Sequence, residues 1–359
     1  MPVRQHWIDK TSLRNTKWVE KEIPLENGQL RLSIDAFALT ANNVTYAAFG
    51  DSPLQYWRFF RTDDAGMGRV PVWGFGTVTA SNVDEIKPGK RVYGYFPISE
   101  TLIVEPTNIT DSGFIDGAEH RNGAAPIYNT YQFTDTDPAY VAEYESEQML
   151  FRPLYLTGWS VADCIAEGSP KPDTAVISSA SSKTALATAH GLQRLGIKTI
   201  GLTSKGNTDF VAGTGLYDET VSYDDIASLP GSGTIAYADY TGSPKILAGV
   251  HASCGNGLIR SITIGATDWE ADRSAPPADL PGPTPEFFFV PDYIVARAKE
   301  LPPGEINRRM MQDLVAFYPV SQQFVTAEIV MGEDAIAEAW TEMVNGDVAP
   351  NRGLICKFG

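Results

Sequence analysis

The chain has 359 residues, 43% of them hydrophobic, and this length predicts two domains that each bury a core. Its 44 acidic and 28 basic residues give a formal net charge of −16, which argues against general binding to nucleic acid or to anionic membranes. No run is long and apolar enough to span a bilayer, and the first residues lack the apolar stretch of a signal peptide. The three cysteines are widely spaced and odd in number, which is typical of a reducing cytoplasm. We therefore expect a cytoplasmic protein.

The first part of the chain, residues 18–110, is expected to be rich in β-strands. Residues 31–39 alternate apolar and polar side chains at their start, as a half-buried strand does. Further strands are expected at residues 73–80, 91–96 and 101–105. Residues 111–137 are rich in Gly, Asn, Asp and Thr and predict a long irregular loop, a kind of segment that is usually functional or mobile.

From residue 143 the pattern changes to an alternation of helices and strands. A helix is expected over 147–165, broken at Pro153 and Gly158. Strands and helices then alternate at 175–179, 184–195, 199–203, 221–223, 234–239, 244–252 and 258–264. This alternation predicts an α/β domain with a doubly wound parallel sheet. A surface loop at 272–285, helices at 287–299, 306–317 and 333–344, and a last strand at 353–358 complete the expected elements.

The segment from Thr174 to Asn207 predicts the strand–helix–strand unit of a dinucleotide-binding sheet. Its turn, residues 178–184, has Ser and Ala in place of the usual G-x-G-x-x-G, and such small residues still let the backbone approach a pyrophosphate. The serine hydroxyls and the helix N-terminus can donate to phosphate, whereas Lys183 is unfavourable in a first helical turn unless an anion binds there. Two other interpretations stay open: a βα turn that binds nothing, and a Walker-type loop, whose required glycines are missing.

The second strand of this unit ends in Thr203, Ser204, Lys205, Gly206 and Asn207. An NAD-preferring site usually has an acidic residue near this point, which binds the ribose 2′-hydroxyl. Hydroxyl, amide and lysine side chains suit a 2′-phosphate instead. The sequence therefore favours NADP(H) over NAD(H), with Lys183 and Lys205 as a local basic island in an acidic protein.

Several local motifs occur in an order that is known from one superfamily. Residues 74–79 are similar to its G-x-G-x-V strand, 87–94 to its P-G-D-R-V-x-G turn, 156–159 to its L-T-A-Y helix, 237–242 to its D-x-x-G strand end and 346–353 to its closing G-x-x-x-G-K turn. With these motifs, the chain resembles the medium-chain dehydrogenase/reductase superfamily. The resemblance implies a GroES-like β-rich domain at residues 1–150 plus 318–359, and a Rossmann-type nucleotide-binding domain at residues 151–317.

Zinc-bearing members of that superfamily carry a G-H-E motif, a catalytic cysteine and a four-cysteine lobe. Here Trp73-Gly74-Phe75 stands at the place of the G-H-E, no C-x-x-C occurs, and the four histidines share no ligand spacing. The chain therefore resembles the zinc-free, NADP(H)-using quinone and enone reductases, which implies reduction of an activated C=C or carbonyl substrate and a homodimer. The cofactor contacts that the resemblance implies are Ser178, Ser179, Ala180, Ser181, Ser182, Lys183, Thr203, Ser204, Lys205, Asn207, Asp239, Tyr240 and Thr241.

Zinc-free members need side chains that donate to the carbonyl oxygen of the substrate while hydride reaches the β-carbon. The superfamily has an Asn and often a Tyr near the nicotinamide. Either Asn42 or Asn43 could align with that Asn, and we take Asn43 and Tyr46 as candidate site residues. The alternative is a turn capped by Asn, with the tyrosine in the core.

Residues 120–132 supply the remaining candidates, His120, Tyr128 and Tyr131. A long loop with this density of His, Arg, Asn and Tyr is what a pocket for a polar, carbonyl-bearing substrate presents, although a solvated loop with surface tyrosines has the same composition. His120 could act as a general acid near neutral pH or have a structural role. The aromatic residues 56–60 could line an apolar pocket, a core or an oligomer interface.

Three functions are compatible with these observations. The first is an NADP(H)-dependent, zinc-independent reductase of an enone, quinone or similar carbonyl compound. The second is an enzyme of retro-aldol, hydrolase or isomerase type that uses the loop 120–132, because a fold does not determine a reaction. The third is a regulatory protein that binds the nucleotide without turning over a substrate.

Overall fold

The computed structural model describes residues 2–51, 54–265 and 280–359 of the chain. By their internal contacts these residues form two compact units, which we treat separately. Unit 1 comprises Met1–Leu150 and Ala327–Gly359, and unit 2 comprises Phe151–Thr326. The expected loop at 272–285 lies largely outside the described residues. None of the helices in the described ranges is long and apolar enough to cross a membrane.

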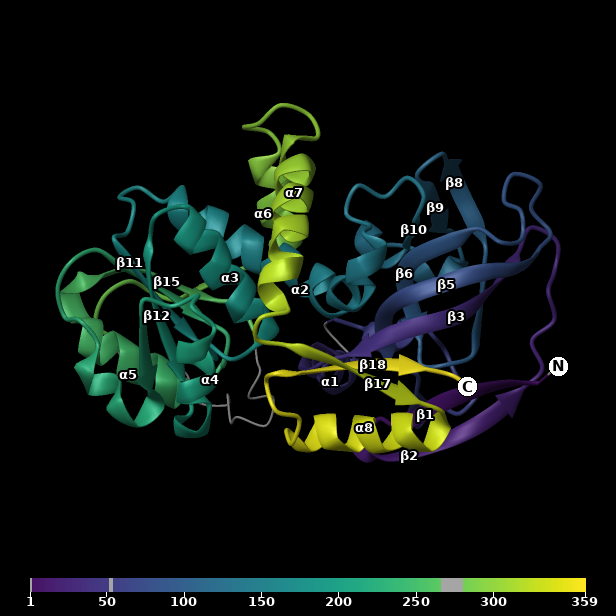
Figure 1. Cartoon of the computed structure of the whole chain (residues 1–359), viewed down its shortest axis with the longest axis horizontal. Helices are drawn as coiled ribbons and strands as arrows, with labels where there is room; N and C mark the ends of the chain where they lie inside the picture. The colour runs from purple at the N-terminus through teal and green to yellow at the C-terminus, as the bar shows by residue number, and fades with distance from the viewer. Residues whose placement is uncertain (1, 52–53, 266–279) are drawn as a thin grey trace. The chain divides into compact units, whose positions relative to one another are not determined.

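Unit 1 is built on β-sheets (Figure 1). The larger sheet has the order β17 (Thr326–Met331), β18 (Arg352–Lys357), β3 (Leu30–Leu39), β5 (Pro71–Ser81), β6 (Arg91–Pro97), β10 (Thr130–Phe133), β9 (Gly113–Asp116) and β8 (Pro106–Thr110), and β7 (Thr101–Val104) pairs with β3. The smaller sheet has the order β2 (Ser12–Lys21), β1 (Val3–Asp9) and β4 (Met67–Gly68). Strands β3, β5 and β6 are antiparallel, and most of their side chains are buried in the core.

Two helices complete unit 1, α1 (Ala41–Ala48) and α8 (Glu333–Asn345). On α8 the side chain of Trp340 is fully buried, and its indole N–H donates to the carbonyl of Leu13 at 2.8 Å. The C-terminal segment thus contributes both an inner strand of the sheet, β18, and a core side chain to a unit that begins at the N-terminus.

The segment 111–137 is more ordered than the sequence predicts. It contains β9 and β10, which pair with each other, and the short 3₁₀ helices η2 (Glu119–Arg121) and η3 (Pro126–Tyr128). The expectation of an irregular loop was wrong here because the polar composition hides tertiary burial: Phe114 and Tyr131 stack at 5.2 Å between their ring centroids, and both are buried.

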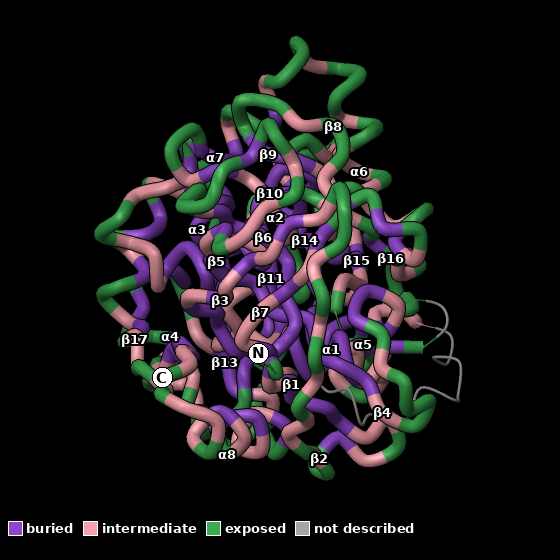
Figure 2. Tube along the Cα trace, turned by 90° about the vertical axis from the view of Figure 1, so that its right-hand side faces the viewer, coloured by how far each residue is buried: buried purple, intermediate pink, exposed green. Residues whose placement is uncertain are grey.

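Unit 2 contains a parallel sheet of the order β13 (Glu219–Ser222), β12 (Lys198–Thr203), β11 (Thr174–Ser178), β14 (Ile235–Asp239), β15 (Leu258–Thr263) and β16 (Glu286–Phe287). Helices α3 (Lys183–Arg194), α4 (Thr208–Gly213) and α5 (Pro244–Cys254) connect its strands and pack on them. The central strands β11 and β14 are buried along almost their whole length (Figure 2). The predicted α/β class, with a β-rich part and a doubly wound parallel sheet, is confirmed.

Helix α2 (Glu145–Ala166) runs through both positions where the sequence predicts a break. At Gly158 the reason is packing: a Cβ there would lie 2.6 Å from the Cβ of Ala187 and 2.8 Å from the carbonyl oxygen of Thr184. The glycine therefore lets α2 approach α3 closely instead of ending the helix.

Helices α6 (Val290–Arg297) and α7 (Glu305–Ser321) follow in unit 2. The expected domain limit at residue 318 falls inside α7, whose Phe317 packs against Phe151 and Tyr155 with ring centroids 5.1 and 5.2 Å apart. Because these contacts hold α7 to unit 2, the compact units divide after Thr326.

Candidate functional site

The carboxyl ends of β11 and β14 are the point in unit 2 where the strand order reverses. From β11 the chain continues through α3 to β12 on one side, and β14 leads to β15 on the other. Open α/β sheets bind their ligands at such a switch point, outside the carboxyl ends of the strands. The turn after β11 and the residues after β14, both predicted to contact the cofactor, meet here.

The turn between β11 and α3 is tight and strained. Ser179 has φ +52°, in the left-handed region that side chains other than glycine seldom adopt, and its N–H donates to the hydroxyl of Tyr223 at 2.9 Å. Ser182 begins the helix, and its Oγ accepts from the N–H of Ala185 at 3.3 Å. A left-handed serine costs about 1–2 kcal/mol, so the neighbouring structure must hold it in place.

Lys183 is the first residue of α3 and is half-buried. Burial lowers the pKa of its ammonium group to about 8. The positive end of the helix dipole also disfavours a cation at this position. A bound anion would relieve both costs.

The segment after β12 lies beside this turn. The side-chain amide of Asn207 donates to the hydroxyl of Ser181 at 3.2 Å, which joins the two segments. Ser204 and Lys205 are exposed, whereas Thr203 is buried. An exposed lysine and an exposed hydroxyl therefore stand at the end of the second strand, where a nucleotide-binding sheet holds the ribose.

Asp239, at the end of β14, is 1% exposed and accepts hydrogen bonds from other residues at the switch point. Its Oδ1 accepts from Ser178 Oγ at 2.9 Å and from Thr241 at 2.9 Å (N–H) and 2.8 Å (Oγ1). The hydroxyl of Tyr240 lies 2.5 Å from that of Thr188 on α3. These side chains thus form hydrogen bonds with one another or with α3. The bonds stabilise the turn between β11 and α3 and involve Ser178, Asp239, Tyr240 and Thr241.

Unit 1 contains a group of aromatic side chains that we call the tyrosine cluster. It consists of Tyr46 on α1, Tyr56 on η1 (Tyr56–Arg58), Phe59, Trp73 on β5, Tyr95 on β6 and Tyr128 on η3. The hydroxyls of Tyr56 and Tyr128 lie 3.3 Å apart, and both residues are half-buried. Tyr46 is buried behind them, where its hydroxyl accepts from the indole N–H of Trp73 at 3.2 Å.

Burial raises the pKa of Tyr46, Tyr56 and Tyr128 above the ordinary value for tyrosine. All three hydroxyls therefore keep their protons at neutral pH and can donate hydrogen bonds. Tyr95 is a member of the cluster that the sequence did not predict as a site residue. It is fully buried on β6, and the sequence indicates only that it lies in a strand.

The other candidate residues in unit 1 are held by internal contacts. Asn43 is 2% exposed; its Oδ1 accepts from the N–H of Thr40 at 2.7 Å at the start of α1, and its amide donates to the carbonyl of Pro71 at 2.9 Å. Tyr131 is fully buried and donates to the carbonyl of Tyr95 at 2.5 Å. The Nε2 of His120 lies 3.1 Å from the carbonyl oxygen of Phe59. These three residues thus support the elements that carry the tyrosine cluster.

His120 is half-buried beside Arg121. Burial and the nearby positive charges of Arg121 and Arg61 lower the pKa of its imidazole. It is consequently neutral at physiological pH.

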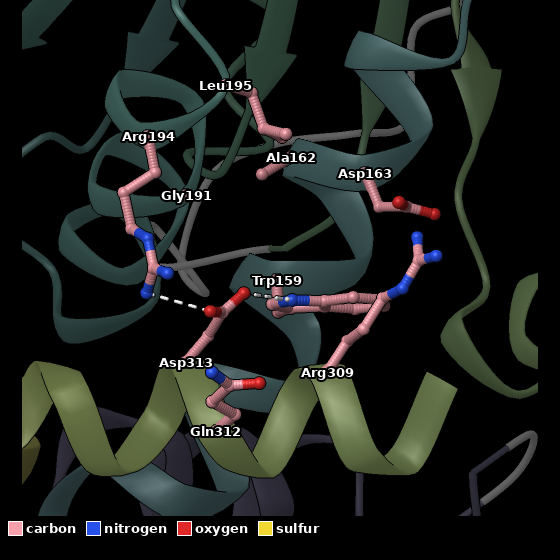
Figure 3. A pocket seen from close by; sticks show the side chains of 9 residues that line it. All are labelled: Trp159, Ala162, Asp163, Gly191, Arg194, Leu195, Arg309, Gln312 and Asp313. Atoms are coloured by element: carbon pink, nitrogen blue, oxygen red, sulfur yellow. Dashed lines mark hydrogen bonds and ion pairs between the residues drawn. The ribbon is translucent and has the colours of Figure 1, made fainter. Parts of the chain in front are cut away.

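Unit 2 also has a cavity of about 260 Å³ between α2, α3 and α7 (Figure 3). Asp313 projects into it, where it accepts from the indole N–H of Trp159 at 3.0 Å and pairs with Arg194 at 2.7 Å. None of the predicted site residues lines it. Within the described ranges, no three His, Cys, Asp or Glu side chains are grouped so as to hold a metal ion.

The fold is that of the medium-chain dehydrogenase/reductases. The chain is similar to the crystal structure of CurA from Vibrio vulnificus in complex with NADPH (TM-score 0.65, 14% identity, 99% of each chain covered). It is also similar to a mutant form of enoyl thioester reductase from Candida tropicalis (0.62, 10%, covering 99% of this chain and 100% of that one). A third similar structure is the yhdH oxidoreductase from Salmonella enterica in complex with NADP (0.56, 12%, covering 99% and 100%).

Residues 37–349 match the family described as "Protein of unknown function (DUF2855)", and the chain belongs to that family. A comparison with curated proteins gives no match.

Proposed function

We propose that this protein is an NADP(H)-dependent, zinc-independent oxidoreductase that reduces an activated C=C or carbonyl compound of the enone or quinone type. The observation that carries the proposal is the switch point of unit 2, where the left-handed turn at Ser179, the helix N-terminus with Lys183 and the exposed Lys205 come together. The similarity to structures determined with NADPH and NADP supports it.

The residues at the switch point fit the chemistry of this cofactor. The turn 179–183 would hold the pyrophosphate with its serine hydroxyls and Lys183. The backbone N–H groups of Ser179, Ala180 and Ser182 donate within the protein instead. Ser204 and Lys205 would hold the 2′-phosphate, since no acidic residue stands at the end of β12 to exclude it. When bound, NADPH supplies the hydride. Ser178, Thr203, Asp239, Tyr240 and Thr241 are buried and act by fixing the turn and the strand ends.

In unit 1 the tyrosine cluster would bind the substrate. Tyr56 and Tyr128 are its two half-buried hydroxyls and can donate to a carbonyl oxygen on which negative charge develops. We propose Tyr128 as the principal donor, because it lies in the loop 120–132 and its hydroxyl is in contact with that of Tyr56. Tyr46, Asn43 and His120 would be positioning residues for this pair, whereas Tyr131 would stabilise the fold around it through its bond to the carbonyl of Tyr95.

The decisive experiment is a fluorescence titration of the protein with NADPH and, separately, with NADH. We expect NADPH to bind much more tightly than NADH. Lys205→Ala should weaken NADPH binding by about 1.5–3 kcal/mol, the value of a charge-assisted hydrogen bond, and should leave NADH binding nearly unchanged. Lys198→Ala is the matched control, because Lys198 is exposed at the opposite end of the same strand, β12.

Equal losses for NADPH and NADH would contradict the assignment of the 2′-phosphate to Lys205. Binding of neither nucleotide would favour an enzyme of retro-aldol, hydrolase or isomerase type. Tight NADPH binding without turnover of any enone or quinone would favour a regulatory protein.

We further propose a homodimer in the cytoplasm. Strand β16 supports the dimer, because it is at the edge of the sheet among the described strands and Phe287 on it is 73% exposed. Such a strand edge can accept a second copy. Light scattering on the purified protein would test the dimer: a monomeric mass would contradict it.

A further inference from the structure

Arg69 carries a buried guanidinium group for which the described part of the chain offers no ion-pair partner. It lies between β4 and β5 in unit 1 and is only 8% exposed. Its Nε has no hydrogen-bond acceptor among the residues that the structure describes, and no described carboxylate pairs with it. The guanidinium carbon lies 5.8 Å from the ring centroid of Phe60, a cation–π contact.

The neighbouring Arg121, in contrast, has a carboxylate partner. It is 1% exposed and lies 5.0 Å from the same ring. Its Nε is 2.8 Å from the carboxylate of Asp116, and its Nη1 donates to the carbonyl of Tyr128 at 3.0 Å. Arg121 and Asp116 cancel each other's charge. Among the described residues, no carboxylate is left to compensate the positive charge of Arg69.

That charge persists at neutral pH. Burial and the proximity of Arg121 lower the pKa of Arg69, but only to about 10. A buried charge without a partner is strongly destabilising, and such a cost is commonly retained only where a site needs it.

Arg69 lies next to the tyrosine cluster. The ring of Phe60, which Arg69 contacts, is 5.9 Å from Tyr95, and Tyr95 is 5.0 Å from Tyr128. Arg121 connects the two groups from the other side, through Phe60 and the backbone of Tyr128. A ligand that donates an anion to Arg69 would therefore extend toward the proposed hydrogen-bond donors.

We propose that Arg69 binds a carboxylate group of the substrate, so that the protein acts on activated alkenes or carbonyl compounds that carry a carboxylate. The inference rests on the proposed function, whose substrate class it narrows. One uncompensated positive charge matches a singly charged carboxylate, which a guanidinium group can bind through two parallel hydrogen bonds. A phosphate dianion would leave one negative charge buried and is disfavoured.

The test compares 4-oxo-4-phenylbut-2-enoate with its neutral methyl ester as substrates in the presence of NADPH. The saturated 4-oxo-4-phenylbutanoate and its methyl ester serve as unreactive ligands in calorimetric titrations, with and without NADPH. We expect the wild type to prefer each carboxylate over its ester by about tenfold or more, with the difference in KM rather than kcat. Arg69→Met should abolish this preference, and Arg69→Lys should retain part of it.

Arg61→Met is the matched control, because Arg61 is an exposed arginine near His120 and should not affect the preference. Arg69→Met should also raise the Tm of the ligand-free protein, since it removes an unpaired buried charge. The proposal is overturned if the wild type shows no preference for carboxylates, if Arg69→Met weakens carboxylate and ester equally, or if Arg69→Met lowers the Tm. Failure to bind NADPH would refute the proposed function alone, because the titrations without NADPH still report on Arg69.

Discussion

Lys183 gives the switch point a pH dependence that can be measured. In the free protein its pKa is lowered from 10.5 to about 8, and a phosphate beside it would raise this pKa again. Because the bound state then holds the proton more tightly, NADPH affinity should be constant below pH 7 and should fall as the pH rises through 8. We expect a loss of about tenfold between pH 7 and 9.5, measured by fluorescence titration.

Lys183→Arg is the control for this effect, since a guanidinium group keeps its charge over the whole range. This variant should bind NADPH with little dependence on pH. Lys183→Ala should bind weakly and also without pH dependence. If the wild type showed the same affinity at both pH values, Lys183 would have no part in phosphate binding.

Tyr128 allows a test of the proposed chemistry in unit 1. Tyr128→Phe removes one hydroxyl and keeps the ring packing against Phe59 and Tyr95. We expect kcat for an enone to fall by about 10- to 100-fold, because a donor to the developing oxyanion is lost. Steady-state kinetics would check this, with Tyr131→Phe as the comparison.

Tyr131→Phe should behave in the opposite way. Its hydroxyl donates to a buried backbone carbonyl, so its loss should lower the free energy of unfolding by about 1 kcal/mol and leave kcat nearly unchanged. Unchanged kcat in Tyr128→Phe would remove Tyr128 from the catalytic assignment.

Some features of single residues could be predicted from the sequence, and others could not. The small residues at 178–182 correctly marked a tight turn, because only small side chains tolerate such a backbone. That Ser178 and Asp239 bond to each other could not be inferred, because their contact depends on two strands 61 positions apart in the chain becoming neighbours. For the same reason nothing in the sequence identified Arg69 as unpaired.

At the scale of helices and strands, the contact between α2 and α3 depends on Gly158. Gly158→Ala would place a Cβ 2.6 Å from Ala187 and 2.8 Å from two backbone atoms of α3, which cannot move aside as a flexible side chain could. We expect the free energy of unfolding to fall by about 1–3 kcal/mol, as measured by thermal or denaturant unfolding.

Gly213→Ala serves as the matched comparison, because Gly213 lies at the end of α4 with no atom near its missing Cβ. This substitution should be neutral or slightly stabilising. A Gly158→Ala protein as stable as the wild type would show that the two helices can separate without cost.

The elements that the sequence predicted well are those whose pattern is set locally. Strands β11, β12 and β14 and helix α3 were placed within a residue or two, because buried parallel strands and amphipathic helices carry strong periodic signals. Helix α2 was predicted with nearly correct ends but with a break that it does not have, and strands β9 and β10 were predicted as an irregular loop. In each case a residue type that usually ends or excludes an element is outweighed by packing against another part of the chain.

At the scale of the whole molecule, the two units differ in how the chain builds them. Unit 2 is one continuous segment, whereas unit 1 needs both ends of the chain, with β18 beside β3 and Trp340 on the carbonyl of Leu13. The order of a β-rich part, a parallel sheet and a return to β-structure was readable from the alternation of patterns. The residue at which the chain returns to unit 1 could not be predicted from the sequence. Helix α7 is an ordinary amphipathic helix, and only its tertiary contacts assign it to unit 2.

This organisation predicts that the units respond separately to ligand and to mutation. Scanning calorimetry should show two transitions, and NADPH at about 100 times its Kd should stabilise the unit 2 transition by about 2.7 kcal/mol. Trp340→Phe should lower only the unit 1 transition, by about 1–3 kcal/mol, since it loses the bond to Leu13 and leaves a cavity. If a single transition is observed, and both NADPH and Trp340→Phe shift its temperature, the two units unfold as one. The cofactor would then stabilise the tyrosine cluster and Arg69 against unfolding as strongly as its own site.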